Sequence, residues 1–204
     1  EYKEKLLMLF KSNNIQYAIE LSKQVGMEDF LVGADLSEAE LRDAVLSDAN
    51  LRGANLRGAK MSHVYLDDAN LEGANLTIAN LYNANLEGAN LEGAVLQGAN
   101  LQSAELEDAN LKAANLKAAN LSSADLTGAN LTGANLQGAD LKYANLTAAD
   151  LTRANLSRAD LTRADLSSTT DLSGANLSDA YLFDTKLGDV KYNKDTIWTK
   201  GYAP

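Results

Sequence analysis

Residues 74–93 read A-N-L-T-I-A-N-L-Y-N-A-N-L-E-G-A-N-L-E-G, and this stretch decides the fold because one five-residue unit recurs throughout it. From Leu31 to Leu166, Leu occupies 27 of the 28 central positions of such units. From Ala34 to Ala164, Ala stands two residues before the centre in 26 of 27 units, and Asn or Asp fills 21 of the 27 positions between them. Self-similarity at a fixed period predicts a solenoid.

Neither regular element can keep Leu on one face at every fifth position. In a straight helix, five residues turn the side chain by about 500°, so successive Leu side chains would spiral round the cylinder. In a straight strand, side chains alternate between faces, so an odd spacing would send successive Leu to opposite sides. One bend per unit removes both problems, because Ala and Leu then point inward from a short extended segment.

The residues around each expected bend suit a corner. Asn or Asp before each Leu points outward and can bond nearby backbone groups, which steadies a turn. Gly is frequent at the second position after Leu, where it tolerates the backbone angles of a corner; examples are Gly53, Gly58, Gly73 and Gly88.

This repeat resembles the pentapeptide-repeat family, whose fold is a right-handed quadrilateral β-helix with four units per coil. The motif covers residues 31–190 approximately and is very specific, because it recurs about thirty times. The resemblance implies an all-β solenoid of about eight coils: the regular units make seven, and the units centred on Leu172 to Leu187 add one. The helical lead-in and the Thr196-Ile197-Trp198 ending with Gly201-Tyr202 resemble cyanobacterial members.

The spacing from Leu166 to Leu172 is six residues instead of five. One extra residue therefore enters near Ser168, Thr169 and Thr170. We expect a local bulge there, and a binding loop is the alternative.

The ends of the chain leave the repeat, so we expect an N-terminal helical cap over 1–28, the β-helix over 29–190 and a C-terminal capping tail over 191–204. Uncovered β-helix ends would expose strand edges and Leu side chains, which invites aggregation. Apolar residues at helical spacing predict one or two short helices that Ser12-Asn13-Asn14 separates and Gly26 ends. Trp198 and Tyr202 are expected to fold over the last coil. The candidate contacts, to the first coil or in a dimer, are Leu6, Leu7 and Phe10.

Composition limits the partners and the compartment. With 18 Lys and Arg against 28 Asp and Glu, the net charge is −10, which disfavours nucleic acid because the phosphate backbone repels an acidic chain. The longest apolar run is far too short for a membrane span. The chain has no Cys, which favours the cytoplasm and leaves the periplasm and thylakoid lumen open. Residue 1 is Glu rather than Met, so removal of a signal peptide is also left open.

Four units per coil would stack residues twenty apart, and this places ten carboxylates on one face with Lys186 as its one cation. The alternatives are a solvated surface and a docking face for the basic surface of another protein. The candidate residues of that docking face are Asp48, Asp67, Asp68, Glu87, Glu105, Glu107, Asp108 and Asp125.

The sequence shows no catalytic constellation. His63 is the one His, the Ser residues occupy expected corners, and the glycines follow the five-residue period instead of forming a phosphate loop. A filled rod also offers no deep pocket. We therefore expect no enzyme activity, no cofactor and no metal.

The favoured function is a non-catalytic protein-interaction scaffold, with a regulatory role open to it. The resemblance implies an alternative, because the family includes quinolone-resistance proteins whose acidic rod imitates DNA and occupies gyrase. The chain would then inhibit or protect DNA gyrase or another topoisomerase. Basic residues on the neighbouring faces, at Arg153, Arg158 and Arg163, weaken this transfer. A homodimer through a rod end or the N-terminal helices is left open.

Overall fold

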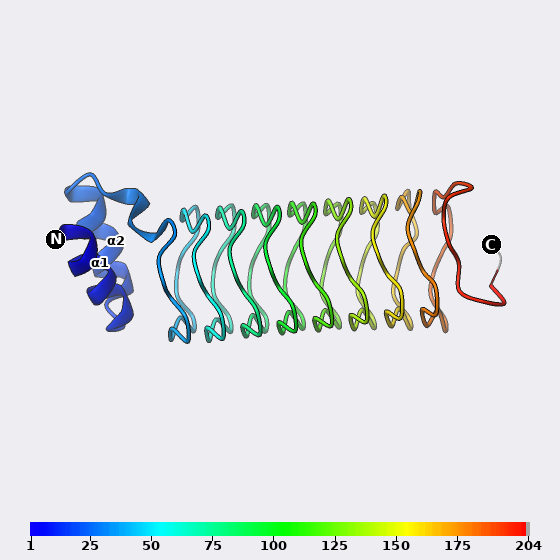
Figure 1. The fold of residues 1–204 in the computed structure, drawn as a ribbon, viewed down its shortest axis with the longest axis horizontal. Coiled ribbons are helices and arrows are strands. Elements are labelled where there is room, and N and C mark those ends of the chain that lie inside the picture. Colours follow the sequence, from blue (N-terminus) through cyan, green and yellow to red (C-terminus); the bar gives the residue numbers. More distant parts are fainter. Residues whose placement is uncertain (203–204) are drawn as a thin grey trace.

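In the computed structural model, which describes residues 1–202, two helices lie at one end of a straight stack of coils (Figure 1). Helix α1 spans Tyr2–Lys11, α2 spans Ile15–Gln24, and a short 3-10 helix, η1, spans Glu28–Leu31. Asn13 takes a φ of 64° between α1 and α2, in the left-handed region that Asn tolerates better than most residues. The two short helices confirm the prediction for this segment, whereas η1 was not predicted.

Each coil takes 20 residues. Tyr65 forms a parallel β-bridge with Asn85, and Asn85 forms the next bridge with Glu105. The N–H of Leu86 donates to the carbonyl oxygen of Glu105 at 2.7 Å, and the N–H of Asn85 donates to that of Val64 at 2.9 Å. Units of the inner coils are therefore bonded to the coils on both sides, and the 20-residue bridge spacing matches four five-residue units per coil.

The extended segments are shorter than β-strands. Residues 1–202 contain isolated β-bridges and no named strand, so the all-β expectation holds only as a ladder of bridges. The reason is the corner residue, which takes a left-handed backbone two positions after each Leu. Gly88 does so at a φ of 65°, and even the β-branched Ile78 does so at 53°. This conformation interrupts any strand.

Asparagine side chains hold the corners, as predicted. The side-chain oxygen of Asn85 accepts a hydrogen bond from the N–H of Glu87 at 3.0 Å. The Asn residues also bond one another between coils, for example from Nδ2 of Asn110 to Oδ1 of Asn90 at 3.0 Å. Their side chains are half-buried, so they are an internal part of each corner.

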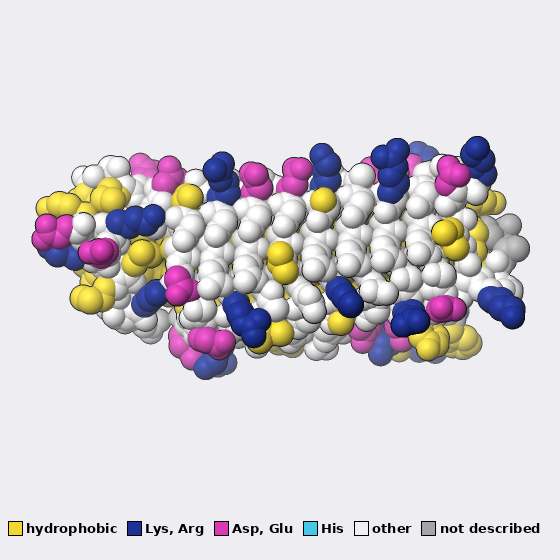
Figure 2. Space-filling view, viewed as in Figure 1, with side chains coloured by type: hydrophobic (Ala, Val, Ile, Leu, Met, Phe, Trp, Pro, Cys, Tyr) yellow, Lys and Arg dark blue, Asp and Glu magenta, His cyan; other side chains and the backbone are white. Residues whose placement is uncertain are grey.

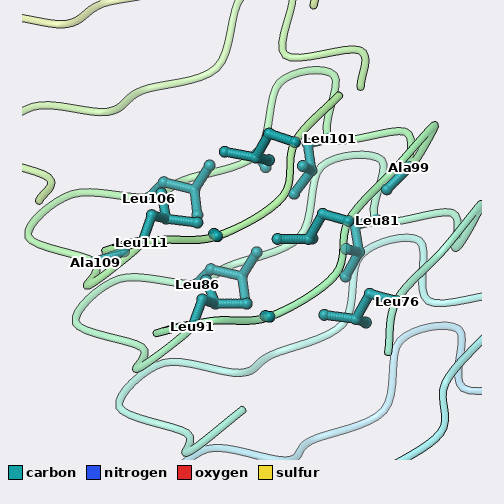
Figure 3. Close-up of a cluster of buried hydrophobic side chains, with 14 of the residues drawn as sticks. Leu76, Leu81, Leu86, Leu91, Ala99, Leu101, Leu106, Ala109 and Leu111 are labelled. Atoms are coloured by element: carbon teal, nitrogen blue, oxygen red, sulfur yellow. The ribbon is translucent and has the colours of Figure 1, made fainter. Parts of the chain in front are cut away.

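Leu and Ala fill the interior of the rod. Leu81 lies beside Leu101 and Leu86 beside Leu106, one coil apart, in a continuous stack (Figure 3). These four side chains are at most 1% exposed. Burying one Leu contributes roughly 1.5–3 kcal/mol, so the repeated stack accounts for the main hydrophobic stabilisation.

The extra residue after Leu166 is absorbed at one corner. The bridge spacing there changes from 20 to 21 residues, between Asp150 and Asp171. Ser168 and Thr169 both take positive φ values, 58° and 72°. The buried hydroxyl of Thr170 donates to a carbonyl oxygen 24 residues earlier at 2.6 Å. The predicted bulge is confirmed.

The ladder of bridges runs beyond residue 190, where we expected the repeat to end, as far as Ile197. Trp198 is partly buried against the core. Its ring meets Tyr192 edge-on, with centroids 5.6 Å apart, and Tyr202 at 5.2 Å. Residues 203 and 204 of the expected tail lie outside the described residues.

Candidate functional site

The eight candidate carboxylates occupy three outward rows on one side of the rod. The bridge ladder at the centre of that side runs through Tyr65, Asn85, Glu105 and Asp125. Asp67, Glu87 and Glu107 follow the buried Leu of each unit, and the remaining three aspartates occupy corners. We call the following eight residues the acidic face: Asp48, Asp67, Asp68, Glu87, Glu105, Glu107, Asp108 and Asp125.

Backbone bonds fix the spacing of these rows. The N–H of Asp48 donates to the carbonyl oxygen of Asp67 at 2.9 Å, and that of Asp68 donates to Glu87 at 2.8 Å. The hydroxyl of Ser47 donates to Oδ1 of Asp67 at 2.7 Å across the same step. Neighbouring coils stack at about 4.8 Å, so the carboxylates repeat along the rod at that interval.

Two glycines give the corner aspartates their room. Asp68 and Asp108 take φ values of 57° and 56°, in the left-handed region. Oδ1 of Asp68 occupies the space where a Cβ on Gly88 would lie, and Oδ1 of Asp108 does the same at Gly128. By position in the five-residue unit, Gly88 and Gly128 are simply turn residues. The signal that finds them is the spacing of 20 between each aspartate and its glycine.

Part of the acidic face encloses a shallow hollow of about 350 Å³. The structure thus brings four of the eight predicted residues into one concave region, and the other four lie outside it. The lining residues are Asp67, Asp68, Asn85, Glu87, Gly88 and Asp108.

Glu107 is a partly buried carboxylate of the acidic face. Partial burial raises its pKa, and the negative charges of Asp125, Glu105 and Glu87 raise it further. Its Oε2 atom is buried and has no hydrogen-bond partner among the described residues. Removing an ionised oxygen from water without a partner costs free energy, so a cation brought to this position would relieve the penalty.

The acidic face differs from other stacked charges on the rod. Elsewhere, residues 20 apart pair opposite charges, as Lys60 does with Glu40 and as Lys112 does with Glu92 (Nζ–Oε1, 3.5 Å). Within residues 1–202, none of the eight carboxylates of the acidic face forms a salt bridge. Residues 20 apart can therefore form salt bridges on this rod, but on the acidic face the residues at this spacing carry the same negative charge.

The face of the molecule in Figure 2 has a different pattern. Backbone and uncharged polar side chains, drawn in white, fill most of its middle, and Lys, Arg, Asp and Glu lie mainly toward its margins in mixture. Charges of both signs at short separation cancel at a distance, so such a surface produces a weak field.

The predicted contact residues of the N-terminal segment are buried or partly buried within the protein. Leu6 and Phe10 are each 1% exposed, and Leu7 is partly buried. The ring of Phe10 meets that of Phe30 edge-on at 6.0 Å, and both belong to the core that continues into the rod. Of the two alternatives for these residues, their burial favours contact with the first coil over a dimer contact.

His63 occupies a corner two residues before Tyr65 of the ladder, with a φ of 58°. Its Nδ1 is 3.2 Å from Nδ2 of Asn83, and its ring meets Tyr82 edge-on at 5.5 Å. In the described part of the chain, no group of three or more His, Cys, Asp or Glu side chains is arranged to hold a metal ion. No helix within residues 1–202 has the length and apolar composition needed to cross a membrane.

Comparison with solved structures gives several pentapeptide-repeat proteins. HetL, involved in regulating heterocyst differentiation in the cyanobacterium Nostoc, is 33% identical, with 85% of this chain and 93% of HetL covered and a TM-score of 0.41. QnrB1, a plasmid-mediated fluoroquinolone resistance protein, is 18% identical, with 80% and 89% covered and a TM-score of 0.45. A protein of the Arabidopsis thaliana thylakoid lumen is 29% identical, with 61% and 70% covered and a TM-score of 0.24.

No curated protein matches the chain significantly. The sequence profile described as pentapeptide repeats matches eight copies, in overlapping segments that together extend from residue 31 to residue 167. This match covers more than half of the chain and coincides with the coils of the rod. The chain therefore belongs to the pentapeptide-repeat family.

Proposed function

We propose that this chain is a non-catalytic scaffold that binds the basic surface of another protein through its acidic face, in a regulatory role. The observation that carries the proposal is a series of stacked carboxylates without salt bridges in the described structure. Such a series costs stability through repulsion, and it attracts and orients a basic partner. The regulatory part rests on HetL, which is 33% identical to this chain.

A paired capture experiment tests this proposal. Wild-type protein and a variant with five neutralised carboxylates would be immobilised in a native lysate, and captured proteins would be identified by mass spectrometry. The variant changes are D67N, D68N, E105Q, E107Q and D108N. A control neutralises five carboxylates outside the acidic face: E38Q, D43N, E72Q, D150N and D179N.

We expect a basic protein that wild type and the control capture and that the variant loses. Equal capture by all three proteins would refute the docking role of the acidic face. Loss with both variants would also refute it, because net charge alone would then explain the binding. Circular dichroism would verify that each variant is folded.

The alternative is a DNA mimic that acts on gyrase or another topoisomerase. The net charge of −10 supports it, whereas the concentration of the net negative charge on one side speaks against it, since DNA presents phosphates all round its axis. A gyrase supercoiling assay distinguishes the two. Lack of inhibition or protection at micromolar protein would eliminate the mimic.

We propose the organisation that the sequence suggests, a cap at 1–28 followed by a β-helix of about eight coils and a C-terminal tail, with the β-helix extended from residue 190 to Ile197 by its bridges. Burial of Leu6 and Phe10 supports the cap. We also propose a homodimer through a rod end. Light scattering tests it, because a monomer mass at micromolar concentration would exclude the dimer.

We further propose a cytoplasmic location, which cell fractionation tests.

A further inference from the structure

A groove lies where α2 meets the first coil, and it adjoins the acidic face. Its volume is about 450 Å³, and its lining includes the apolar side chains of Ile19 and Val45. Asp48, the first residue of the acidic face, lines the same groove. Nε2 of Gln16 donates to the carbonyl oxygen of Val45 at 2.8 Å, which ties α2 to the rod beside the groove. The groove therefore lies at a hydrogen-bonded junction between α2 and the first coil of the rod.

An apolar strip connects the groove with the charged rows. Val45 and Tyr65 are paired in the bridge ladder, and each is 50% exposed. Asn or Asp is the usual residue at this position of the repeat, so both side chains depart from the unit by becoming apolar. Lys23 on α2 also lines the groove, together with the acids Glu28 and Asp29. An apolar side chain placed in this groove would thus be surrounded mainly by negative charge.

The spacing of the carboxylates fits a helix. Three coil steps, from the coil of Asp48 to that of Asp108, span about 14 Å at 4.8 Å per step. Three turns of an α-helix span about 16 Å, so one basic side chain per turn stays within reach of one carboxylate per coil. In an extended strand, side chains on one face repeat at about 6.7 Å, and three intervals span about 20 Å. The side chains of a strand therefore move about 2 Å further from the matching carboxylates at each coil, and about 6 Å over three coils.

The backbone of the rod gives a second reason against an extended partner. Binding by strand addition needs unpaired N–H and C=O groups at a sheet edge. On this side of the rod they are already paired: the N–H of Asn85 donates to Val64, and the N–H of Leu86 donates to Glu105. A partner lying on the acidic face must therefore bind through side chains, and an amphipathic helix presents them in one row.

We propose that the groove and the acidic face together bind one amphipathic basic helix of a partner protein. An apolar residue of that helix occupies the groove against Ile19 and Val45. Lys or Arg residues on the following three turns then contact Asp67 and Asp68, Glu87, and Glu107. The inference rests on the proposed docking function and adds the class of partner and its direction along the rod.

Synthetic peptides test the inference directly. The probe is an Ala-rich helix of about 16 residues with Leu in its first turn and Lys once on each of the next three turns. One control peptide has the same composition with two central Ala replaced by Pro, and another replaces Leu by Ala. Binding to the full chain would be measured by fluorescence anisotropy. The protein variants are V45N and the combined D67N, D68N, E87Q and E107Q.

We expect the combined variant to bind the probe about 30-fold more weakly, which corresponds to the loss of three surface ion pairs of about 0.7 kcal/mol each, the first of them shared between Asp67 and Asp68. V45N introduces the usual residue of the repeat, so the fold has no reason to fail, and it should weaken binding about fivefold. It should leave binding of the peptide without Leu unchanged. The Pro-containing peptide should bind at least tenfold more weakly than the probe.

Three results would overturn the inference. The first is equal affinity for the helical and Pro-containing peptides, the second is no effect of V45N on the probe, and the third is no binding of any peptide. If peptides fail while the lysate experiment still yields a basic partner lost with the neutralised variant, the docking function stands and the helical mode falls. If both fail, the proposed function falls as well.

Discussion

Two glycine corners in neighbouring units allow a matched test of how the acidic face is built. Gly88 and Gly93 have the same φ, 65°, but a Cβ on Gly88 would collide with the carboxylate of Asp68, whereas a Cβ on Gly93 would meet nothing within 4 Å. Ala occupies the same corner at Ala113 with a φ of 56°. The repeat therefore accepts Ala at a corner, and the difference between the two sites lies in the neighbouring side chain.

The expected magnitudes follow from these contacts. In G93A, the left-handed backbone costs about 1 kcal/mol, and the reduced freedom of the unfolded chain offsets roughly 0.4–1 kcal/mol of that cost. G88A carries the same two effects and also pushes the carboxylate of Asp68 off its preferred rotamer, at about 1 kcal/mol. G93A should therefore be nearly neutral, and G88A should lower the free energy of unfolding by about 1 kcal/mol.

Thermal unfolding at one heating rate, followed by circular dichroism, measures this difference. About 1 kcal/mol corresponds to a decrease in Tm of roughly 2–4 °C for a chain of this size. In a D68A background the G88A and G93A variants should become equal, because the colliding group is absent. Equal Tm values in the wild-type background, or a difference that persists with D68A, would refute the reasoning.

Three further predictions concern the core, the acidic face and the bulge. Leu91→Ala should lower the free energy of unfolding by about 3 kcal/mol in urea titrations, and Leu182→Ala, partly buried, should cost less; equal losses would contradict this. Glu107→Gln should raise Tm at pH 7, because a raised pKa means that stability is lost as pH rises and the group ionises. At a pH well below the ordinary carboxyl range the same substitution should leave Tm unchanged. The exposed Glu105→Gln is its control, and a pH-independent effect would count against this cause. Thr170→Val should cost about 1 kcal/mol in urea titrations through its buried hydroxyl hydrogen bond, and no loss would exclude that contribution.

The fold was largely predictable because the interior repeats strictly. Leu at every fifth position leaves no straight element available, so a bend per unit follows from side-chain geometry alone. The absence of named strands was less evident. It depends on the corner residue being left-handed even at Ile78, which nothing in its side chain favours. The continuation of the ladder to Ile197 was also missed, since the residues around it no longer match the unit.

The sequence predicts which carboxylates lie in rows along one side of the rod, but it does not predict the hollow or the groove. Counting by 20 assigns Asp68 and Asp108 to one side of the rod, and the bridge ladder supports that register. The hollow depends on Gly88 leaving space for a side chain one coil away. The groove beside Val45 depends on how α2 lies against the first coil, and helical spacing within residues 15–24 carries no information about that placement.

Because one coil takes twenty residues, the alignment of outward residues between coils depends on the number of units in the chain, whereas the core needs only the five-residue spacing of Leu. Insertion of one complete unit would keep every Leu inside, yet it would rotate all later outward residues to the adjacent face. Glu105 would then no longer follow Asn85 in the ladder. Only a change of four whole units lengthens the rod and leaves the acidic rows continuous. The single residue added near Thr169 is harmless in this respect, because one corner takes it up before the next face begins.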